Sequence, residues 1–98
     1  MNEVPAKDVA PHRRIVTICN RRGLHARAAA RFVKLADQFT AEITVSKNGA
    51  AVSGRSIMGL MMLAAGSGTA VELICEGPDA ERALAALADL IGSGFDEE

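Results

Sequence analysis

Two segments of this chain repeat apolar residues at the spacing of an α-helix, and this periodicity limits the possible folds more than any other feature. Within residues 26–38, alanine, phenylalanine and valine recur at intervals of three and four, which places them on one helical face. Residues 78–91 repeat the pattern with alanine, leucine and isoleucine. Each helix therefore has one apolar side that the rest of the chain must cover.

Short runs of β-branched or alternating residues lie between the helical segments. Strands are predicted over residues 13–19, 41–47, 50–53 and 69–76. Asn48-Gly49 predicts a tight turn between the second and third strands, because both residues tolerate positive φ. Ser56 is suited to cap a short helix over residues 57–64. The predicted order is β-α-β-β-α-β-α, an α+β two-layer domain with its helices on one face of an antiparallel sheet.

The chain has the length and composition of one folded domain. It has 98 residues, of which 49% are apolar and 23% are charged, as is typical of a globular protein. We expect residues 12–92 to form this domain. Residues 1–11 are expected to be a flexible leader, because Pro5 and Pro11 interrupt regular structure, and residues 93–98 a frayed tail.

Composition and charge argue against several classes of function. A net charge of −1 gives no bulk attraction to nucleic acid or to an anionic membrane. Three Phe and no Trp or Tyr offer few platforms for base stacking. No apolar run approaches the roughly 20 residues that span a bilayer, and residues 1–7 lack the apolar core of a signal peptide. A cytoplasmic protein is therefore expected.

The two cysteines, Cys19 and Cys75, both lie in apolar, strand-like runs. Neither belongs to a Cys-x-x-Cys pair or has a neighbouring histidine. Buried free thiols are therefore favoured over a disulfide or a metal site. The sequence shows no cofactor motif and no other cluster with metal-ligand spacing, so neither a cofactor nor a metal is predicted.

His25 follows a glycine turn and stands directly in front of the first predicted helix. Four arginines surround it in the sequence: Arg21, Arg22, Arg27 and Arg31. A helix start leaves backbone N–H groups unpaired and carries partial positive charge, so it can hold an anion such as phosphate. The same surroundings favour the neutral imidazole, which has the lone pair needed to attack phosphorus. On the residues alone, His25 is either a phosphoryl acceptor or a surface histidine that caps the helix, whereas His12 is expected to be an ordinary strand residue.

Residues 57–63 are apolar nearly all round, which is unusual for a short surface helix. Part of this run must cover the sheet. Met58, Met61 and Met62 are each either core residues or part of an adaptable docking surface, because methionine is unbranched and polarizable. At least one apolar side chain of this helix is expected to be exposed.

Two motifs in this chain carry a family resemblance. Gly23-Leu24-His25-Ala26-Arg27, followed by Ala29-Ala30-Arg31-Phe32-Val33, resembles the active-site signature of the HPr family. These proteins are the histidine-containing phosphocarriers of the bacterial phosphotransferase system. Arg55-Ser56-Ile57-Met58-Gly59-Leu60-Met61 resembles the family's second signature, around a regulatory serine. The element order also matches, so the resemblance extends over residues 13–91.

The resemblance implies a role for three residues. His25 corresponds to the histidine that accepts phosphate on Nδ1 from enzyme I and passes it to an enzyme IIA. Arg27 corresponds to the arginine that pairs with the phosphate, and Ser56 to a serine that HPr kinase/phosphorylase modifies in some bacteria. The phosphoryl group would come from phosphoenolpyruvate through enzyme I, without a cofactor. The chain would thus be a monomeric carrier and not an enzyme.

The resemblance also implies an open-faced sandwich, with a four-stranded antiparallel sheet in the order 1-4-2-3 and three helices on one face. In this order Cys19 and Cys75 fall near opposite ends of neighbouring strands, beyond disulfide reach. Partners are expected to dock on apolar residues of a shared face: Leu24, Ile57, Met58, Leu60 and Met61. A phosphate on Ser56 would add negative charge beside this face and weaken transfer at His25.

One position departs from the family pattern, since Ala28 stands where the family usually has proline. Alanine restores a backbone N–H in the first turn of the helix. Ala28, Arg55 and the Met-rich helix resemble family members that serve a regulatory, nitrogen-related branch. The alternatives are a sugar-transport carrier and a docking-type regulator controlled by Ser56. An enzyme with its own substrate is disfavoured, because the sequence places no second general acid or base near His25.

Overall fold

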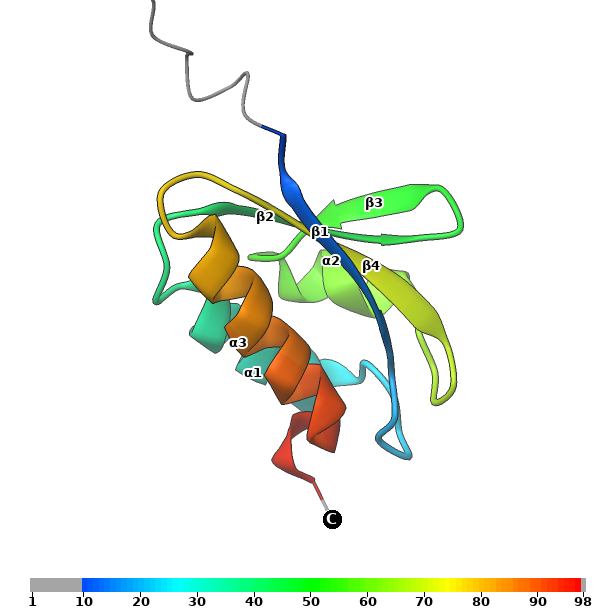
Figure 1. The fold of residues 1–98 in the computed structure, drawn as a ribbon. Helices are drawn as coiled ribbons and strands as arrows, with labels where there is room; N and C mark the ends of the chain where they lie inside the picture. Colours follow the sequence, from blue (N-terminus) through cyan, green and yellow to red (C-terminus); the bar gives the residue numbers. More distant parts are fainter. Residues whose placement is uncertain (1–9, 98) are drawn as a thin grey trace, which may run out of the picture.

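The structure, a computed structural model, describes residues 10–97. Its strands are β1 (His12–Thr17), β2 (Glu42–Lys47), β3 (Ala50–Ser53) and β4 (Ala70–Glu76), and its helices are α1 (Ala26–Ala36), α2 (Ile57–Met62) and α3 (Ala80–Gly92). A one-turn 3-10 helix, η2 (Gly94–Asp96), follows α3. The predicted order β-α-β-β-α-β-α is confirmed (Figure 1). Of the expected leader, residues 1–9 lie outside the described residues.

The four strands form one antiparallel sheet in the predicted order β1-β4-β2-β3. In β4, a central strand, Val71, Leu73 and Cys75 are buried and alternate with more exposed residues, so one face of the strand belongs to the core. Asn48 and Gly49 have φ values of 50° and 86°. The turn between β2 and β3 therefore has the positive φ values that the sequence predicted.

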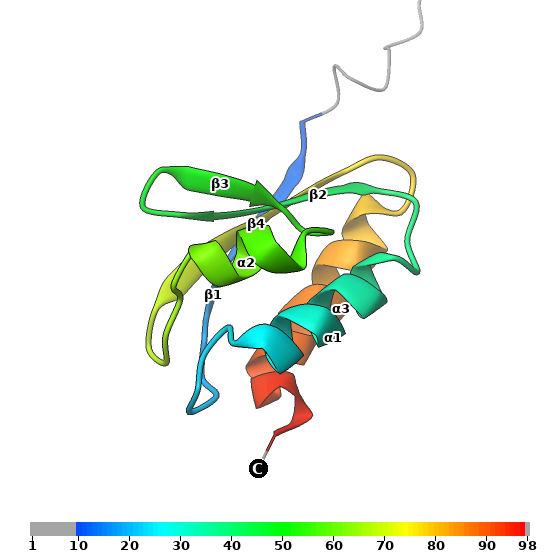
Figure 2. The same ribbon diagram turned by 180° about the vertical axis from the view of Figure 1, so that it is seen from behind.

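All three helices cover the same face of the sheet, and α1 and α3 lie side by side (Figures 1 and 2). The predicted helical stripes meet the buried side of the sheet in one core, whose largest fully buried side chains are Phe32, Phe95, Ile18, Ile43, Leu60, Leu73, Leu87 and Ile91. The opposite face of the sheet carries no helix among the described residues. None of these helices is long and apolar enough to cross a lipid bilayer.

The start of α3 differs from the prediction. The helix begins at Ala80, so Pro78 lies before it and not in its first turn. Asp79 occupies the capping position, but its carboxylate accepts a hydrogen bond from the Thr40 N–H at 2.7 Å. Asp79 thus ties the start of α3 to the loop that follows α1.

The expectation of a frayed tail over residues 93–98 is wrong for residues 93–97. Phe95 is fully buried, and its carbonyl accepts a hydrogen bond from Arg31 on α1. Gly94, Phe95 and Asp96 all have positive φ, which turns the chain back toward the start of α1. The burial of one aromatic side chain therefore orders this segment as far as Glu97.

The two cysteines are both free, as predicted, but only Cys75 is buried. Burial raises the pKa of the Cys75 thiol. The expectation of a buried Cys19 is wrong, because β1 ends at Thr17 and the Cys19 side chain reaches the surface, where its thiol donates to the Ile91 carbonyl at 3.2 Å. Cys75 pairs with His12 at the far end of β1, so the two thiols lie at opposite ends of neighbouring strands, as expected.

Candidate functional site

His25 lies at the end of a tight loop that only glycine can form. Gly23 has a φ of +69°, and a Cβ atom at this position would lie 2.5 Å from the carbonyl oxygen of Ala65. The next residue, Leu24, donates its N–H to the same oxygen at 2.9 Å. The loop before α1 is therefore held against the loop after α2.

His25 is the N-cap of α1. Its backbone is extended, with φ −77° and ψ 179°, and its carbonyl accepts the first helical hydrogen bond, from Ala29 at 2.8 Å. Its ring nitrogen Nδ1 accepts from the Arg27 N–H at 3.3 Å. The capping interpretation of His25 is thus correct. It is compatible with the functional one, because the capping atom is the nitrogen that would carry a phosphoryl group.

The other ring nitrogen faces a carboxylate that sequence reasoning missed. Nε2 of His25 lies 2.6 Å from Oε2 of Glu97, and the second oxygen of Glu97 accepts a hydrogen bond from Nδ2 of Asn20 at 3.0 Å. Because a carboxylate only accepts, Nε2 must carry a proton, and Nδ1 then keeps its lone pair for the Arg27 N–H. The hydrogen bonds from Asn20 and then from His25 lower the pKa of Glu97, so it is ionised at neutral pH.

Asn20 is the polar residue that joins this network to the glycine loop. It is 5% exposed, and its Nδ2 donates to the Gly23 carbonyl at 2.8 Å as well as to Glu97. Its Oδ1 has no hydrogen-bond partner among the described residues. The two hydrogen bonds of Nδ2 therefore link the glycine loop to the Glu97 carboxylate.

The four arginines near His25 in the sequence come together at one surface hollow, which Glu97, the carboxylate bonded to His25, also lines. The lining residues are Arg21, Arg22, Arg27, Arg31, Asp96 and Glu97. The guanidinium of Arg31, on α1, donates a hydrogen bond to the Phe95 carbonyl. For Arg21, Arg22 and Arg27, which are exposed, no guanidinium partner is found among residues 10–97, so these three groups are available to pair with an anion in the hollow.

Ser56 is the N-cap of α2, as predicted. Its Oγ accepts a hydrogen bond from the Gly59 N–H at 2.9 Å. Ser56 is not beside His25, because the opposite end of α2 leads to Ala65 and the glycine loop. Six helical residues separate the two ends, which is about 9 Å along the axis.

The predicted docking residues divide into core and surface. Leu24 and Leu60 are buried, so their assignment to a docking face is wrong; their side chains fill the space between the helices and the sheet. Ile57, Met58 and Met61 are exposed, and so is Met62, which was not among the docking residues predicted. These four exposed side chains form the apolar surface of α2, a name used below in this sense.

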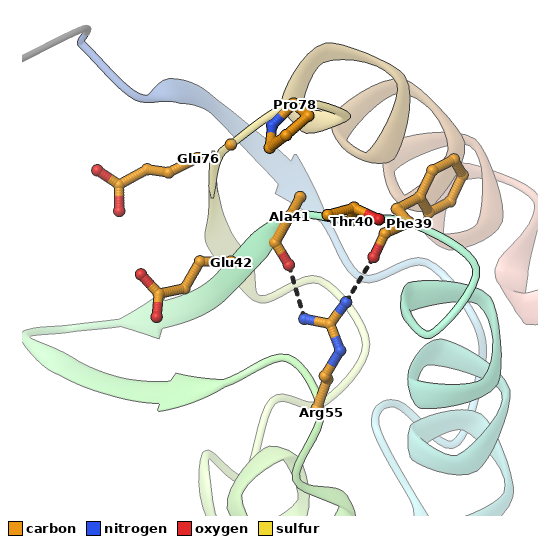
Figure 3. Close-up of a pocket in the computed structure, with 8 residues that line it drawn as sticks. Phe39, Thr40, Ala41, Glu42, Arg55, Glu76 and Pro78 are labelled. Carbon is orange, nitrogen blue, oxygen red and sulfur yellow. Dashed lines mark hydrogen bonds between the residues drawn. The ribbon is translucent and has the colours of Figure 1, made fainter. Parts of the chain in front are cut away.

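A second hollow lies away from His25, where α1 ends and α3 begins (Figure 3). Arg55 extends into it and donates to the carbonyl oxygens of Ala41 at 2.7 Å and Phe39 at 2.8 Å. The same guanidinium bonds the Ala36 carbonyl at 3.0 Å and pairs with Asp37 at 3.2 Å. The helix α1 ends at Ala36, two residues before the end predicted from the sequence, Gln38. Arg55 binds the last residue of this helix and the loop that follows it.

Ala28, the position that departs from the family pattern, is fully buried under the first turn of α1. Its methyl group packs in the core, while α1 keeps regular helical structure from Ala26 onward.

Within residues 10–97, no three His, Cys, Asp or Glu side chains gather as the ligands of a metal ion would.

Comparison with known proteins matches nearly the whole domain. A family model described as "PTS HPr component phosphorylation site" matches residues 12–93. The phosphocarrier protein HPr of Neisseria meningitidis serogroup A is 51% identical over 82 residues, which are 84% of this chain and 92% of that protein. The phosphocarrier protein NPr of Shewanella violacea is 46% identical over 84 residues, 86% of this chain and 92% of that protein. The crystal structure of HPr from Thermoanaerobacter tengcongensis has a TM-score of 0.85 at 46% identity, and the match covers 89% of this chain and 98% of that one.

Proposed function

The chain belongs to the HPr family, the phosphocarriers of the bacterial phosphotransferase system, and on this premise we propose that His25 accepts a phosphoryl group on Nδ1 and passes it to another protein. One observation supports this assignment most directly: Nδ1 of His25 lies 3.3 Å from the Arg27 N–H at the start of α1. A phosphate on Nδ1 would meet the unpaired N–H groups and the positive end of the helix dipole.

The chemistry of the transfer follows from the state of the ring. The lone pair of neutral His25 attacks phosphorus through Nδ1, and the bond between phosphorus and the donor nitrogen breaks as the new bond forms. Arg27, Arg21 and Arg22 then offset the charge of the phosphate. These arginines are exposed, so water weakens their attraction and the group can still be released.

The partners follow from the same role. Enzyme I, charged by phosphoenolpyruvate, is the donor and an enzyme IIA the acceptor, so the carrier needs no cofactor of its own. Both partners dock on the apolar surface of α2, which is joined to the His25 loop through the bond from Leu24 to Ala65. The carrier acts as a monomer, because one chain supplies His25, Arg27 and Glu97, and it works in the cytoplasm, where phosphoenolpyruvate is made.

A phosphorylation assay tests this function. The chain is incubated with enzyme I and phosphoenolpyruvate, and we expect it to gain an acid-labile phosphate. His25→Ala should remove this phosphate, whereas the matched variant His12→Ala, which changes the exposed histidine at the start of β1, should retain it. A chain that stays unlabelled, or a His25→Ala variant that is still labelled, contradicts the proposal.

Regulation at Ser56 is a second part of the proposal. A phosphate on this N-cap would place a double negative charge beside Ile57 and Met58 and so weaken partner docking without unfolding the domain. We further propose that the carrier serves the regulatory, nitrogen-related branch of the phosphotransferase system, because Ala28, Arg55 and the Met-rich helix resemble those of such carriers.

The rate of phosphoryl transfer to different enzymes IIA tests this branch. Faster transfer to a nitrogen-type than to a sugar-type enzyme IIA supports it, and the reverse order assigns the chain to sugar transport.

A further inference from the structure

Two residues from distant parts of the chain hold the Nε2 side of the His25 ring. Glu97 contacts Nε2 at 2.6 Å through one carboxylate oxygen, and its other oxygen accepts from Asn20 at 3.0 Å. The side chains of His25 and Glu97 are only 15% and 16% exposed, so water competes weakly for these bonds. Both oxygens of the carboxylate are therefore engaged, and its orientation toward the ring is fixed.

The turn after α3 brings Glu97 next to Nε2 of His25. Phe95 has a φ of 57°, which is unfavourable for a bulky side chain, yet it is fully buried and its carbonyl is bound by Arg31. The packing of Phe95 and the bond from Arg31 stabilise this backbone. Glu97 is thus held in place by the core and by α1, and is not a loose terminal residue near a histidine.

We propose that Glu97, oriented by Asn20, is a positioning residue that fixes His25 as the Nε2–H tautomer and keeps that proton on the ring after phosphorylation. The first half of this statement concerns the unmodified chain alone. The second half rests on the proposed phosphocarrier function.

The proton on Nε2 matters in both directions of transfer. When Nδ1 attacks phosphorus, the Nε2 proton stays, the donor's bond to phosphorus breaks, and the ring becomes a phosphoimidazolium whose positive charge faces the Glu97 carboxylate. When the group leaves, the electron pair of the Nδ1–P bond returns to the ring, which departs as neutral imidazole. Without the Nε2 proton the leaving group would be an imidazolate anion, a much poorer one. Glu97 would therefore keep the phosphoryl group transferable.

Nitrogen-15 NMR of the full chain tests the first half without any phosphorylation. We expect the long-range ¹H–¹⁵N pattern of neutral His25 to show Nε2–H as the main tautomer. Glu97→Ala should give a mixture of both tautomers, while Glu97→Gln, which retains an acceptor oxygen, should remain mostly Nε2–H. The control Asp89→Asn removes the same charge from an exposed residue of α3 that does not line the arginine hollow, and should leave the tautomer unchanged. An unchanged tautomer in Glu97→Ala overturns the proposal.

The rate at which the phosphorylated chain returns its phosphate to enzyme I tests the second half. Glu97→Ala and Glu97→Gln should both slow this step several-fold, because both remove the negative charge, whereas Asp89→Asn should not. Equal rates in all four proteins overturn this half of the proposal. If the parent chain accepts no phosphate at all, the phosphocarrier function fails, but the tautomer experiment still decides the role of Glu97.

Discussion

The N–H of Leu24 donates a 2.9 Å hydrogen bond to the carbonyl of Ala65, which joins the loop before α1 to the loop after α2. The first loop presents His25, and the second continues the helix whose apolar surface is exposed. This bond therefore keeps Nδ1 of His25, the proposed phosphoryl acceptor, at a fixed distance from the apolar surface of α2, where we propose that partners dock. Any change that separates the two loops should disturb transfer as well as stability.

Gly23→Ala is predicted to break this connection. The new Cβ would lie 2.5 Å from the Ala65 oxygen, and alanine would have to adopt a φ of +69°. We expect a loss of about 1–3 kcal/mol in the free energy of unfolding, measured with urea. Gly66→Ala is the control, because no atom lies within 4 Å of a Cβ at that position. Equal stability of the two variants would mean that the loop contact is not needed.

Phe95→Ala is predicted to be the most damaging change in the C-terminal segment. The side chain is fully buried, and large-to-small changes of buried aromatic residues cost about 3–5 kcal/mol. Thermal unfolding should show a large fall in Tm, and proteases should cut the segment after α3 more rapidly. Phe95→Leu, which keeps most of the buried volume, should cost clearly less. A Phe95→Ala variant as stable as the parent would show that this turn is frayed after all.

Arg55→Lys should destabilise the domain although both residues carry the same charge. The planar guanidinium bonds the carbonyl oxygens of Phe39 and Ala41 (Figure 3) and also that of Ala36. Lysine cannot reach all three oxygens together. We expect a loss of about 1.5–3 kcal/mol in urea unfolding. Arg13→Lys is the matched control, since the guanidinium of Arg13 makes one exposed ion pair among the described residues, with Glu72, and should lose less than about 1 kcal/mol. If the two variants lose the same free energy of unfolding, the carbonyl contacts of Arg55 do not stabilise the domain.

The sequence predicted those parts of the fold and of the site that depend on residues close together in the chain. Periodicity located α1, β2, β4 and α3, because each of these elements buries one face in a regular spacing. β1 and β3 are exposed along most of their length, and their β-branched residues and the Asn48-Gly49 turn located them instead. The glycine turn and helix start placed His25, and the N-cap preference placed Ser56. Contacts between distant segments left no such pattern: the partner of His25 at Nε2 lies 72 residues away. The one available sign was Phe95, a large apolar residue in an otherwise polar tail.

Exposure was the property that sequence predicted least well in α2. Leu60 and Met61 are adjacent and both apolar, yet the first is fully buried and the second is exposed. Which apolar residues of an all-apolar helix face the core depends on the helix's rotation about its axis, and that rotation is set by packing on α1 and the sheet. Cys19 was assigned to the core for a similar reason, because the predicted strand continued two residues beyond Thr17.

Ser56→Asp is predicted to slow phosphoryl transfer from enzyme I without unfolding the domain. Aspartate is itself a good N-cap, so the bond to the Gly59 N–H can be kept and the melting curve should change little. Ser56→Ala, by contrast, should cost about 1 kcal/mol in stability and leave transfer intact. Ser53→Asp places the same charge on exposed β3 and serves as the control for transfer. Unchanged transfer in Ser56→Asp together with an unchanged melting curve contradicts regulation at this site.

The free energy of unfolding at acidic pH should depend on the contacts of Glu97. The hydrogen bonds from Asn20 and then from His25 lower the pKa of Glu97 below its ordinary value of 4.5. A carboxyl group with a lowered pKa in the folded state stabilises the protein at pH values above 4.5, and this stabilisation is lost as the pH falls through the folded-state pKa. Glu97→Gln should therefore be less stable than the parent at pH 7, and the difference should shrink and vanish as the pH is lowered below 4.5. Urea unfolding of both proteins from pH 7 to pH 3 measures this. A difference that stays constant over the whole range would show that the carboxylate charge of Glu97 is not used in the folded state.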